Sequence, residues 1–333
     1  MIDRREFLAA LAALGTVPLS FPGRAQGLAR AVPIDVHHHI LPPEYVKAIA
    51  HRRETRVPDW SPQRSLDEID GAGIATAMLS LVNPGPWFGD AAEARRLARI
   101  ANDYGARMAH DHPGRFGLFA SIPLPDTEGS LREIEYAYGT LKADGIALVT
   151  NYEGRYLGDA AFAPVWQELD RRNAVVYTHP IQGACCRDVK DDVSSSTIEY
   201  ATDTTRTMAS VLFSGTAARY PNIRWIFSHG GGTVPFLLSR FTAAEATMKD
   251  KSRLPNGVIS ELRKFYYDTA QANHAGALAA LLKLVPVSQV VLGTDFPFRR
   301  AAGEIAGIAS YGFSAADIRA IEGGNALRLL GRA

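Results

Sequence analysis

The sequence predicts a single α/β domain with the architecture of a (β/α)8 TIM barrel. Two observations carry this prediction. Short apolar segments rich in β-branched residues alternate along the chain with longer segments of helical periodicity. Eight such strand segments follow one another, and eight consecutive strand–helix units are the number that closes a parallel sheet into a barrel.

The order of the elements can be predicted from the same pattern. We expect strands at residues 33–37, 76–81, 116–122, 145–150, 175–179, 223–229, 265–269 and 290–294. Helical periodicity is clearest at residues 91–112, 130–143, 162–172 and 202–219. An open doubly wound sheet is the alternative, but that fold places a Gly-rich phosphate-binding turn after its first strand. Here the position holds His-His-His-Ile-Leu-Pro, which favours the closed barrel.

The N-terminus has the layout of a bacterial export signal. Arg4 and Arg5 precede an apolar run at residues 7–19, and a Gly-Arg-Ala sequence then offers a small-x-small cleavage site. The apolar run is too short to span a bilayer, and the paired arginines are typical of the twin-arginine signal. We therefore expect a signal peptide at residues 1–25, a barrel domain at residues 32–333 and a periplasmic location.

Charge and cysteine content exclude several classes of protein. Removal of the expected signal takes three arginines and two acidic residues from totals of 36 and 35, which leaves 33 of each and a formally neutral chain. Such a chain has no basic field for nucleic acid or an anionic membrane, so we expect neither as a partner. The only two cysteines, Cys185 and Cys186, are adjacent and cannot close a loop in the usual way, so the fold does not depend on disulfides.

Four of the nine histidines fall at the C-terminal ends of predicted strands, where barrel enzymes carry their active sites. His37 and His39 end the first strand. Residues two apart on a strand point to the same side, so we expect these two side chains to face one way and that of His38 the other. His179 ends the fifth strand and His229 ends the sixth.

These side chains can form a mononuclear metal site. His37, His39 and His179 supply imidazole nitrogens, and Asp295, after the eighth strand, supplies a carboxylate. This donor set suits one divalent ion, zinc most naturally and manganese as the alternative. His229 precedes three glycines, which would let the backbone approach a ligand closely, so we expect it to be a general acid/base beside the metal. No lysine ends the fourth strand, which argues against a second, lysine-bridged metal.

The segments that carry these residues resemble the amidohydrolase superfamily. They are most similar to the branch of the aminocarboxymuconate-semialdehyde decarboxylases and related aromatic-acid decarboxylases. The resemblance implies a metal held by the four ligand positions, catalysis at the positions of His229 and Asp295, and a small carboxylate as substrate. We also expect a homodimer. The matching segments are residues 34–39, 176–180, 227–232 and 292–298.

The same branch holds its substrate carboxylate with an arginine ahead of the second strand. The resemblance assigns this role to Arg53, seven positions before Trp60, with Arg52 and Arg56 as rivals. A second arginine of the family, supplied by a neighbouring subunit, is missing because its position holds Met248. This difference disfavours a dicarboxylate and favours a monocarboxylate, as in the 6-methylsalicylate decarboxylase type.

The leading hypothesis is metal-dependent, non-oxidative decarboxylation of a hydroxylated aromatic acid. Phe296, beside Asp295, and Trp87 with Phe88 after the second strand are candidates to line the pocket for the aromatic ring. Hydrolysis of a lactone, ester or amide by metal-bound hydroxide is the main alternative, and hydration of an unsaturated acid is another. A secreted metal-dependent binding protein without turnover is disfavoured, because the ligand set and His229 are all retained.

Overall fold

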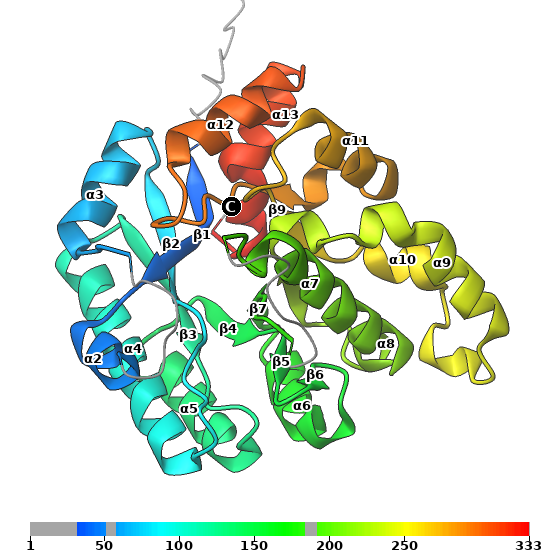
Figure 1. Ribbon diagram of the computed structural model, residues 1–333, viewed down its shortest axis with the longest axis horizontal. Helices are drawn as coiled ribbons and strands as arrows, with labels where there is room; N and C mark the ends of the chain where they lie inside the picture. Colours follow the sequence, from blue (N-terminus) through cyan, green and yellow to red (C-terminus); the bar gives the residue numbers. More distant parts are fainter. Residues whose placement is uncertain (1–31, 51–57, 184–191, 333) are drawn as a thin grey trace, which may run out of the picture. The chain divides into compact units, whose positions relative to one another are not determined.

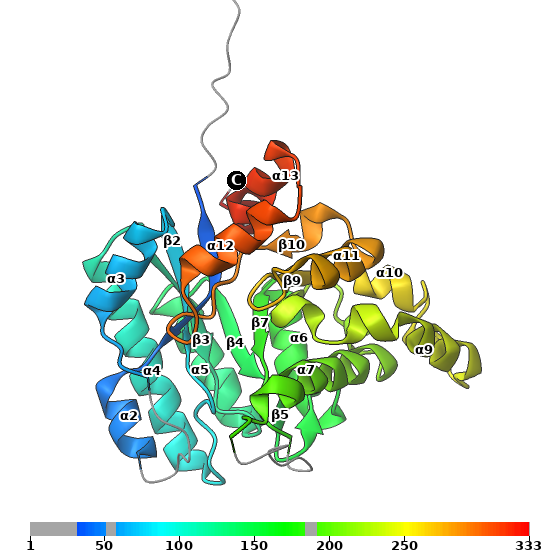
Figure 2. The same ribbon diagram turned by 45° about the horizontal axis from the view of Figure 1, so that its top comes forward.

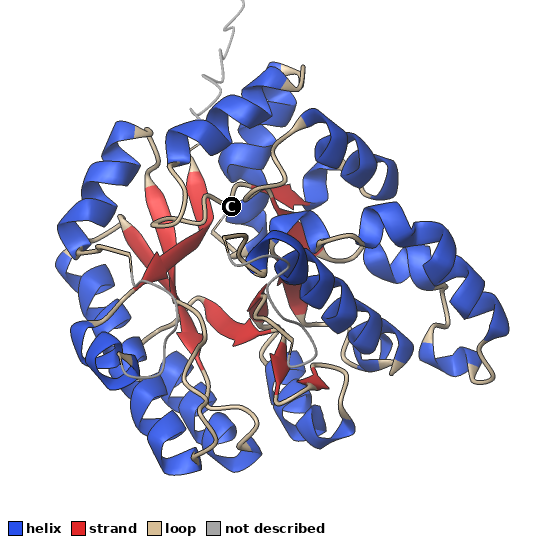
Figure 3. Cartoon of the chain, in the orientation of Figure 1, coloured by secondary structure: helices blue, strands red, loops and turns tan. Residues whose placement is uncertain are grey.

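The computed structural model describes residues 32–50, 58–183 and 192–332. Eight parallel strands form one sheet, and helices are arranged around it (Figure 1, Figure 3). In the order of the sheet, which is also the order of the chain, the strands are β1 (Ile34–Ile40), β2 (Thr76–Leu81), β3 (Phe116–Ser121), β4 (Gly145–Val149), β7 (Val175–His179), β8 (Arg224–Phe227), β9 (Tyr266–Asp268) and β10 (Val290–Val291).

The helices lie outside the ring of strands, as the tilted view in Figure 2 also shows. A short antiparallel ribbon, β5 (Asn151–Tyr152) with β6 (Arg155–Tyr156), follows β4. Within the described ranges, no helix combines the length and apolar character needed to cross a membrane. The helices are α2 (Pro43–Ile49), α3 (Pro62–Gly71), α4 (Ala91–Asp111), α5 (Thr127–Gly139), α6 (Ala163–Arg171), α7 (Ser196–Phe213), α8 (Thr216–Arg219), α9 (Val234–Thr247), α10 (Val258–Leu262), α11 (Ala275–Leu284), α12 (Ala301–Ser310), α13 (Ala315–Arg319) and α14 (Asn325–Leu329).

The barrel closes between β1 and the segment that follows β10. The backbone N–H of His39 donates to the carbonyl of Phe296 at 2.8 Å, and that of Asp295 donates to the carbonyl of His37 at 2.9 Å. These bonds join the first strand to the segment after the last and confirm the predicted (β/α)8 barrel. They also exclude the open doubly wound sheet.

All eight predicted strands are present, and their boundaries shift where neighbouring segments decide them. β1 continues to Ile40 because its last residues pair with β2. The last strand is shorter than predicted because the chain after Val291 turns toward β1. The helix predicted at residues 202–219 is divided into α7 and α8, because Gly215 adopts a left-handed φ of 79°.

Capping side chains set where helices begin. The Asp90 carboxylate accepts the backbone N–H of Glu93 at 2.7 Å and starts α4. Helix α5 begins earlier than its periodicity predicts, because Asp126 caps it by accepting the backbone N–H of Gly129 at 3.0 Å. The spacing of apolar residues in the sequence does not by itself indicate such a cap.

An aromatic pair lies inside the barrel close to the C-terminal ends of the strands. Phe119 of β3 stacks on Tyr177 of β7 with ring centroids 5.7 Å apart, and both side chains are buried. The Tyr177 ring lies 5.3 Å from that of His37. This pair supplies an apolar support for the histidines at the strand ends.

Candidate metal and active site

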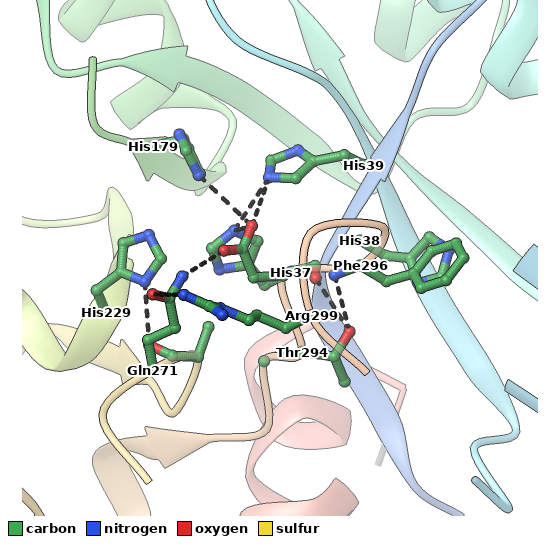
Figure 4. A network of polar contacts seen from close by, with 12 residues as sticks. His37, His38, His39, His179, His229, Gln271, Thr294, Phe296 and Arg299 are labelled. Carbon is green, nitrogen blue, oxygen red and sulfur yellow. Dashed lines mark hydrogen bonds and ion pairs between the residues drawn. The ribbon is translucent and has the colours of Figure 1, made fainter. Parts of the chain in front are cut away.

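The ends of β1 and β7 and the segment after β10 bring the four predicted ligands together (Figure 4). Asp295 Oδ1 lies 3.2 Å from His37 Nε2, 3.3 Å from His39 Nε2 and 4.0 Å from His179 Nε2. One donor atom from each residue lies within 4.8 Å of the others, and all four residues are buried. Three nitrogens and one carboxylate oxygen therefore surround a single point.

This donor set fits one metal ion. His179 Nε2 and Asp295 Oδ1 are buried and have no hydrogen-bond partner within the described part of the chain. Burial of unpartnered polar atoms is costly unless another group satisfies them. The Nε2 atoms of His37 and His39 also face each other at 3.1 Å. A cation among these atoms would satisfy all of them, so the group can hold one metal ion.

Hydrogen bonds on the far side of each imidazole fix its orientation. His37 Nδ1 lies 2.9 Å from Asp268 Oδ2, and His39 Nδ1 lies 3.2 Å from the hydroxyl of Ser80. His179 Nδ1 lies 2.9 Å from the backbone oxygen of the next residue. Each ring thus uses Nδ1 for orientation and turns Nε2 toward the common point, as is usual for metal-binding histidines.

The imidazole of His37 lies between two carboxylates, those of Asp268 and Asp295. Burial lowers the pKa of His37, but Asp268 and Asp295 outweigh it and raise that pKa to about 10. Burial favours neutral Asp295, yet the charge on His37 and the close polar contacts of Oδ1 with His37 and His39 hold the pKa of Asp295 well below its usual value. Burial lowers the pKa of His39 and lowers that of His179 further. The last two imidazoles are therefore neutral at pH 7, the state that binds metal.

His229 lies beside this group. Its ring centroid is 5.0 Å from that of His37 and 5.5 Å from that of His179. Its Nδ1 lies 3.0 Å from the backbone oxygen of Ala270, while its buried Nε2 has no hydrogen-bond partner among the described residues. Burial lowers the pKa of His229. The residue therefore presents a neutral imidazole nitrogen next to the four candidate ligands.

The three glycines that follow His229 are required by packing. A Cβ atom at Gly231 would lie 2.7 Å from the ring of Tyr267, and one at Gly232 would lie 2.2 Å from the backbone oxygen of Ala201. All three glycines also have positive φ. The glycines therefore let the turn that carries His229 pack closely against neighbouring parts of the barrel. We had expected a different role for them, which was to let the backbone approach a ligand.

Two residues of the site, Asp268 and Gln271, are not among those predicted from the sequence. Asp268 uses its second oxygen, Oδ1, to accept the backbone N–H groups of His229 at 2.9 Å and Ala270 at 3.1 Å. Gln271 donates from Nε2 to Asp295 Oδ2 at 2.6 Å. A signal for Asp268 was present, because a carboxylate ends a predicted strand at the face where active sites form. Gln271 follows that strand in a turn and gave no such signal.

Phe296 lies behind β1, away from the candidate ligands. Its ring stacks on that of His38 with centroids 4.8 Å apart, and His38 is turned toward Ser65, as the strand alternation predicts. Phe296 is 4% exposed, so this position gives no support to its predicted contact with substrate. Phe298 is 43% exposed and its ring lies 5.9 Å from that of His39, so an aromatic side chain two positions further along the chain does lie beside a candidate ligand.

Several sequence predictions fall outside the described residues. They concern the signal peptide at residues 1–25, the substrate arginine Arg53 with its rivals Arg52 and Arg56, and the cysteine pair at 185–186.

A cavity beside His179 is lined by apolar side chains together with the hydroxyl residues Ser80, Ser121 and Tyr177. A larger cavity, about 570 Å³, lies on the outer side of the barrel near α6 and α8 and contains none of the candidate ligands. Of the two cavities, the smaller one, about 10 Å³, is the one that a candidate ligand lines, and that ligand is His179.

The fold and the histidine–aspartate group, which could hold one metal ion, define an amidohydrolase-type barrel. The chain belongs to the amidohydrolase family, whose family model (Amidohydro_2) matches residues 34–332. It is 38% identical over 283 residues to decarboxylase macB of Penicillium terrestre, an alignment that covers 80% of this chain and 84% of that protein. It is 36% identical over 273 residues to a 6-methylsalicylic acid decarboxylase of Penicillium expansum, covering 79% and 84%.

Solved structures share the same barrel. A crystal structure of an amidohydrolase II superposes with a TM-score of 0.84 at 29% identity and covers 90% of this chain and 99% of its own. A dihydroxybenzoic acid decarboxylase of Polaromonas, with bound manganese and the inhibitor 2-nitroresorcinol, has a TM-score of 0.76 at 23% identity and covers 90% and 96%. At that identity the second likeness is one of fold.

Proposed function

We propose that the protein is a metal-dependent, non-oxidative decarboxylase of a hydroxylated aromatic acid of the 6-methylsalicylate type. The observation that carries this proposal is the convergence of His37, His39, His179 and Asp295 on one point beside the unpartnered imidazole of His229. The two Penicillium relatives, aligned over 80% and 79% of this chain, are both decarboxylases. They favour decarboxylation over hydrolysis of a lactone, ester or amide.

We assign the four converging side chains to one divalent metal ion. Three imidazoles with one carboxylate are typical of zinc, and manganese, which the Polaromonas structure contains, is the alternative. When bound, such an ion supplies positive charge that attracts the substrate carboxylate and its neighbouring phenolic oxygen and stabilises the negative charge that develops in the reaction. Metal analysis of the purified protein should find about one ion per chain and identify it.

Proton transfer is assigned to His229, with Asp295 as the second candidate. With its Nδ1 proton directed to Ala270, His229 presents Nε2 as a base. It can take the proton of the substrate hydroxyl and deliver it to the ring carbon that bears the carboxylate. The bond between that carbon and the carboxylate then breaks, its electron pair returns to the ring, and carbon dioxide leaves. The phenolic oxygen regains a proton from water.

The surroundings of the site suit an aromatic ring. Phe298, whose ring lies 5.9 Å from that of His39, offers an exposed ring surface beside the candidate ligands. The hydroxyl residues Ser80 and Ser121 line the small cavity beside His179, which is about 10 Å³ in volume.

Deuterated water provides the test. With 6-methylsalicylate or a similar ortho-hydroxy acid, the phenol formed should carry deuterium at the carbon that lost its carboxylate, with carbon dioxide released and no organic cofactor added. Turnover of lactones or esters without turnover of any aromatic acid would transfer the function to the hydrolase alternative. Water addition to an unsaturated acid would instead identify a hydratase.

Two further proposals concern assembly and location. We propose a homodimer, which light scattering of the purified protein can test. We also propose that residues 1–25 direct periplasmic export through the paired arginines. The Arg4→Lys/Arg5→Lys variant should then stay in the cytoplasm of the native host while the unchanged chain reaches the periplasm. Equal distribution of the two proteins would contradict the export proposal.

A further inference from the structure

We propose that Gln271 is a positioning residue that sets the rotation of the Asp295 carboxylate, and that Arg299 in turn holds Gln271. The inference rests on the proposed metal site and concerns how this chain presents one of its ligands. Figure 4 shows Gln271 and Arg299 joined to each other beside the histidine group.

The two carboxylate oxygens of Asp295 have different surroundings. Oδ1 faces the imidazoles, at 3.2 Å from His37 Nε2 and 3.3 Å from His39 Nε2. Oδ2 accepts the Nε2–H of Gln271 at 2.6 Å. This second bond joins an amide donor to an ionised acceptor, which is one of the stronger kinds of hydrogen bond. Rotation of the carboxylate would break it, so the bond keeps Oδ1 directed at the metal position.

The orientation of the Gln271 amide is determined by the groups at both of its ends. Arg299 Nη2 donates to Gln271 Oε1 at 3.1 Å, and a guanidinium has only donors. The Asp295 carboxylate has only acceptors. A flipped amide would present its NH₂ group to the arginine and its oxygen to the carboxylate, so only the observed orientation satisfies both contacts. Arg299 thus acts on Asp295 through Gln271.

The backbone at Gln271 is held in place as firmly as its side chain. Its N–H donates to Glu304 Oε2 at 3.1 Å, and its φ is 53°, in the left-handed region. Six non-glycine residues of the described chain have positive φ, and three of them are His229, Gln271 and Asp295. Such backbone persists where the surrounding structure determines it, and it gathers at functional sites. The side chain of Gln271 therefore extends to Asp295 from a backbone whose position is determined by its surroundings.

Gln271 is an exposed residue, so water competes for Asp295 Oδ2 whenever the amide is lost. A hydrated carboxylate can rotate and exchange its two oxygens, which lowers the fraction of molecules that present Oδ1 to the metal. Hydrogen-bond partners of metal-binding side chains typically contribute about ten- to a hundredfold to metal affinity. The arrangement therefore predicts an effect on metal binding that is measurable without any turnover.

The test is a double-mutant cycle read out by the dissociation constant for zinc, measured by competition with a chelator. Gln271→Met keeps the length of the side chain and removes the amide, and it should weaken zinc binding about tenfold or more. Arg299→Met should weaken it less. The double variant should bind no more weakly than Gln271→Met alone, because Arg299 acts through Gln271. Additive losses, or an unchanged constant in Gln271→Met, would overturn the inference.

Three comparisons keep the result interpretable. Gln289→Met, which removes an amide bonded to the backbone of Phe265, and Arg300→Met, whose guanidinium pairs with Glu68, should leave zinc binding unchanged. Gln271→Asn tolerates left-handed backbone but is one methylene short, so it should resemble Gln271→Met. Full zinc affinity in Gln271→Asn would assign the effect to backbone strain and overturn the role of the amide.

Two measurements distinguish this inference from direct substrate binding by Arg299 and from the proposed decarboxylase function. If Arg299→Met raises KM for an aromatic acid while zinc binding stays unchanged, the arginine binds substrate directly and its action through Gln271 is wrong. If no aromatic acid is turned over by the unchanged protein, the decarboxylase proposal fails, but the zinc-binding cycle still tests the role of Gln271.

Discussion

The Nδ1 atom of His37 lies 2.9 Å from Oδ2 of Asp268, and both side chains are fully buried. The carboxylate accepts the Nδ1 proton, so the Nε2 lone pair of a neutral His37 faces the other candidate ligands. The other oxygen of Asp268 accepts the backbone N–H of His229. One carboxylate therefore orients a candidate metal ligand and the candidate proton carrier together.

Replacement of Asp268 should therefore disturb two functions at once. Asp268→Asn can present an NH₂ group to His37 and stabilise the wrong tautomer, so we expect metal affinity to fall about ten- to a hundredfold. Chelator competition measures this, with Asp90→Asn as the control because asparagine also caps helices. Unchanged metal affinity in Asp268→Asn would show that the hydrogen bond does not orient His37.

Metal binding should release a proton. Asp268 and Asp295 raise the pKa of His37 to about 10, so the metal-free protein carries a proton on His37 at pH 8 that a metal must displace. The metal association constant should rise about tenfold per pH unit from pH 7 toward pH 10 and level off above it. Calorimetry in buffers of different ionisation enthalpy counts the released protons. An association constant independent of pH would contradict this assignment.

The same shift sets how the stability of the metal-free protein depends on pH. The folded pKa of His37 lies above its unfolded value, so the stabilisation from its charged form is fully present below about pH 6.5 and is lost as the pH rises through about 10. Denaturant unfolding of metal-free protein should therefore show a fall in stability across this range. His37→Ala should remove this part of the pH dependence.

Two substitutions separate proton transfer from metal binding. His229→Asn should keep the metal and lower kcat by about 10²–10⁴-fold, as for a positioned acid/base. Asparagine also tolerates the φ of 54° at this position, so the turn should survive. Asp295→Asn should lose both activity and part of the metal affinity. Loss of metal from the His229→Asn variant would mean that His229 is itself a ligand.

The substrate arginine is the remaining prediction, and it lies outside the described residues. Arg53→Ala should raise KM for the carboxylate substrate more than Arg52→Ala does, because a paired carboxylate contact is worth about 1.5–3 kcal/mol. That energy corresponds to roughly a ten- to hundredfold change. A larger effect of Arg56→Ala would place the carboxylate contact three positions later in the chain.

Sequence patterns were sufficient for the barrel and for the group of four candidate ligands. The period of two in β1 places His37 and His39 on one side, and the rule that barrel sites form at strand ends adds His179 and Asp295. Both inferences need only local spacing and the direction of the strands. The structure follows them closely because parallel strands in a barrel end at a common face.

Contacts between distant segments could not be predicted in this way. Asp268 and His37 are separated by 231 positions, and the bond between Gln271 and Asp295 depends on a turn with left-handed backbone. Phe296 shows the limit of an inference from proximity in sequence. Its proximity to Asp295 in sequence suggested a place at the site, but the backbone bond of Phe296 to His39 sets its ring against His38 on the other side of β1.

Closure of the barrel has a consequence for the order in which the protein matures. The backbone bond from Asp295 to His37 joins residues 258 positions apart (295 − 37) in a chain of 333, so the two residues meet only after this late segment has left the ribosome and docked on the first strand. Every earlier species, whether a nascent chain or a partly folded intermediate, contains the histidines without the aspartate that completes their group. A metal ion at this group would therefore be held by all four candidate ligands only once the fold is complete, after the pairing of segments that are distant in sequence.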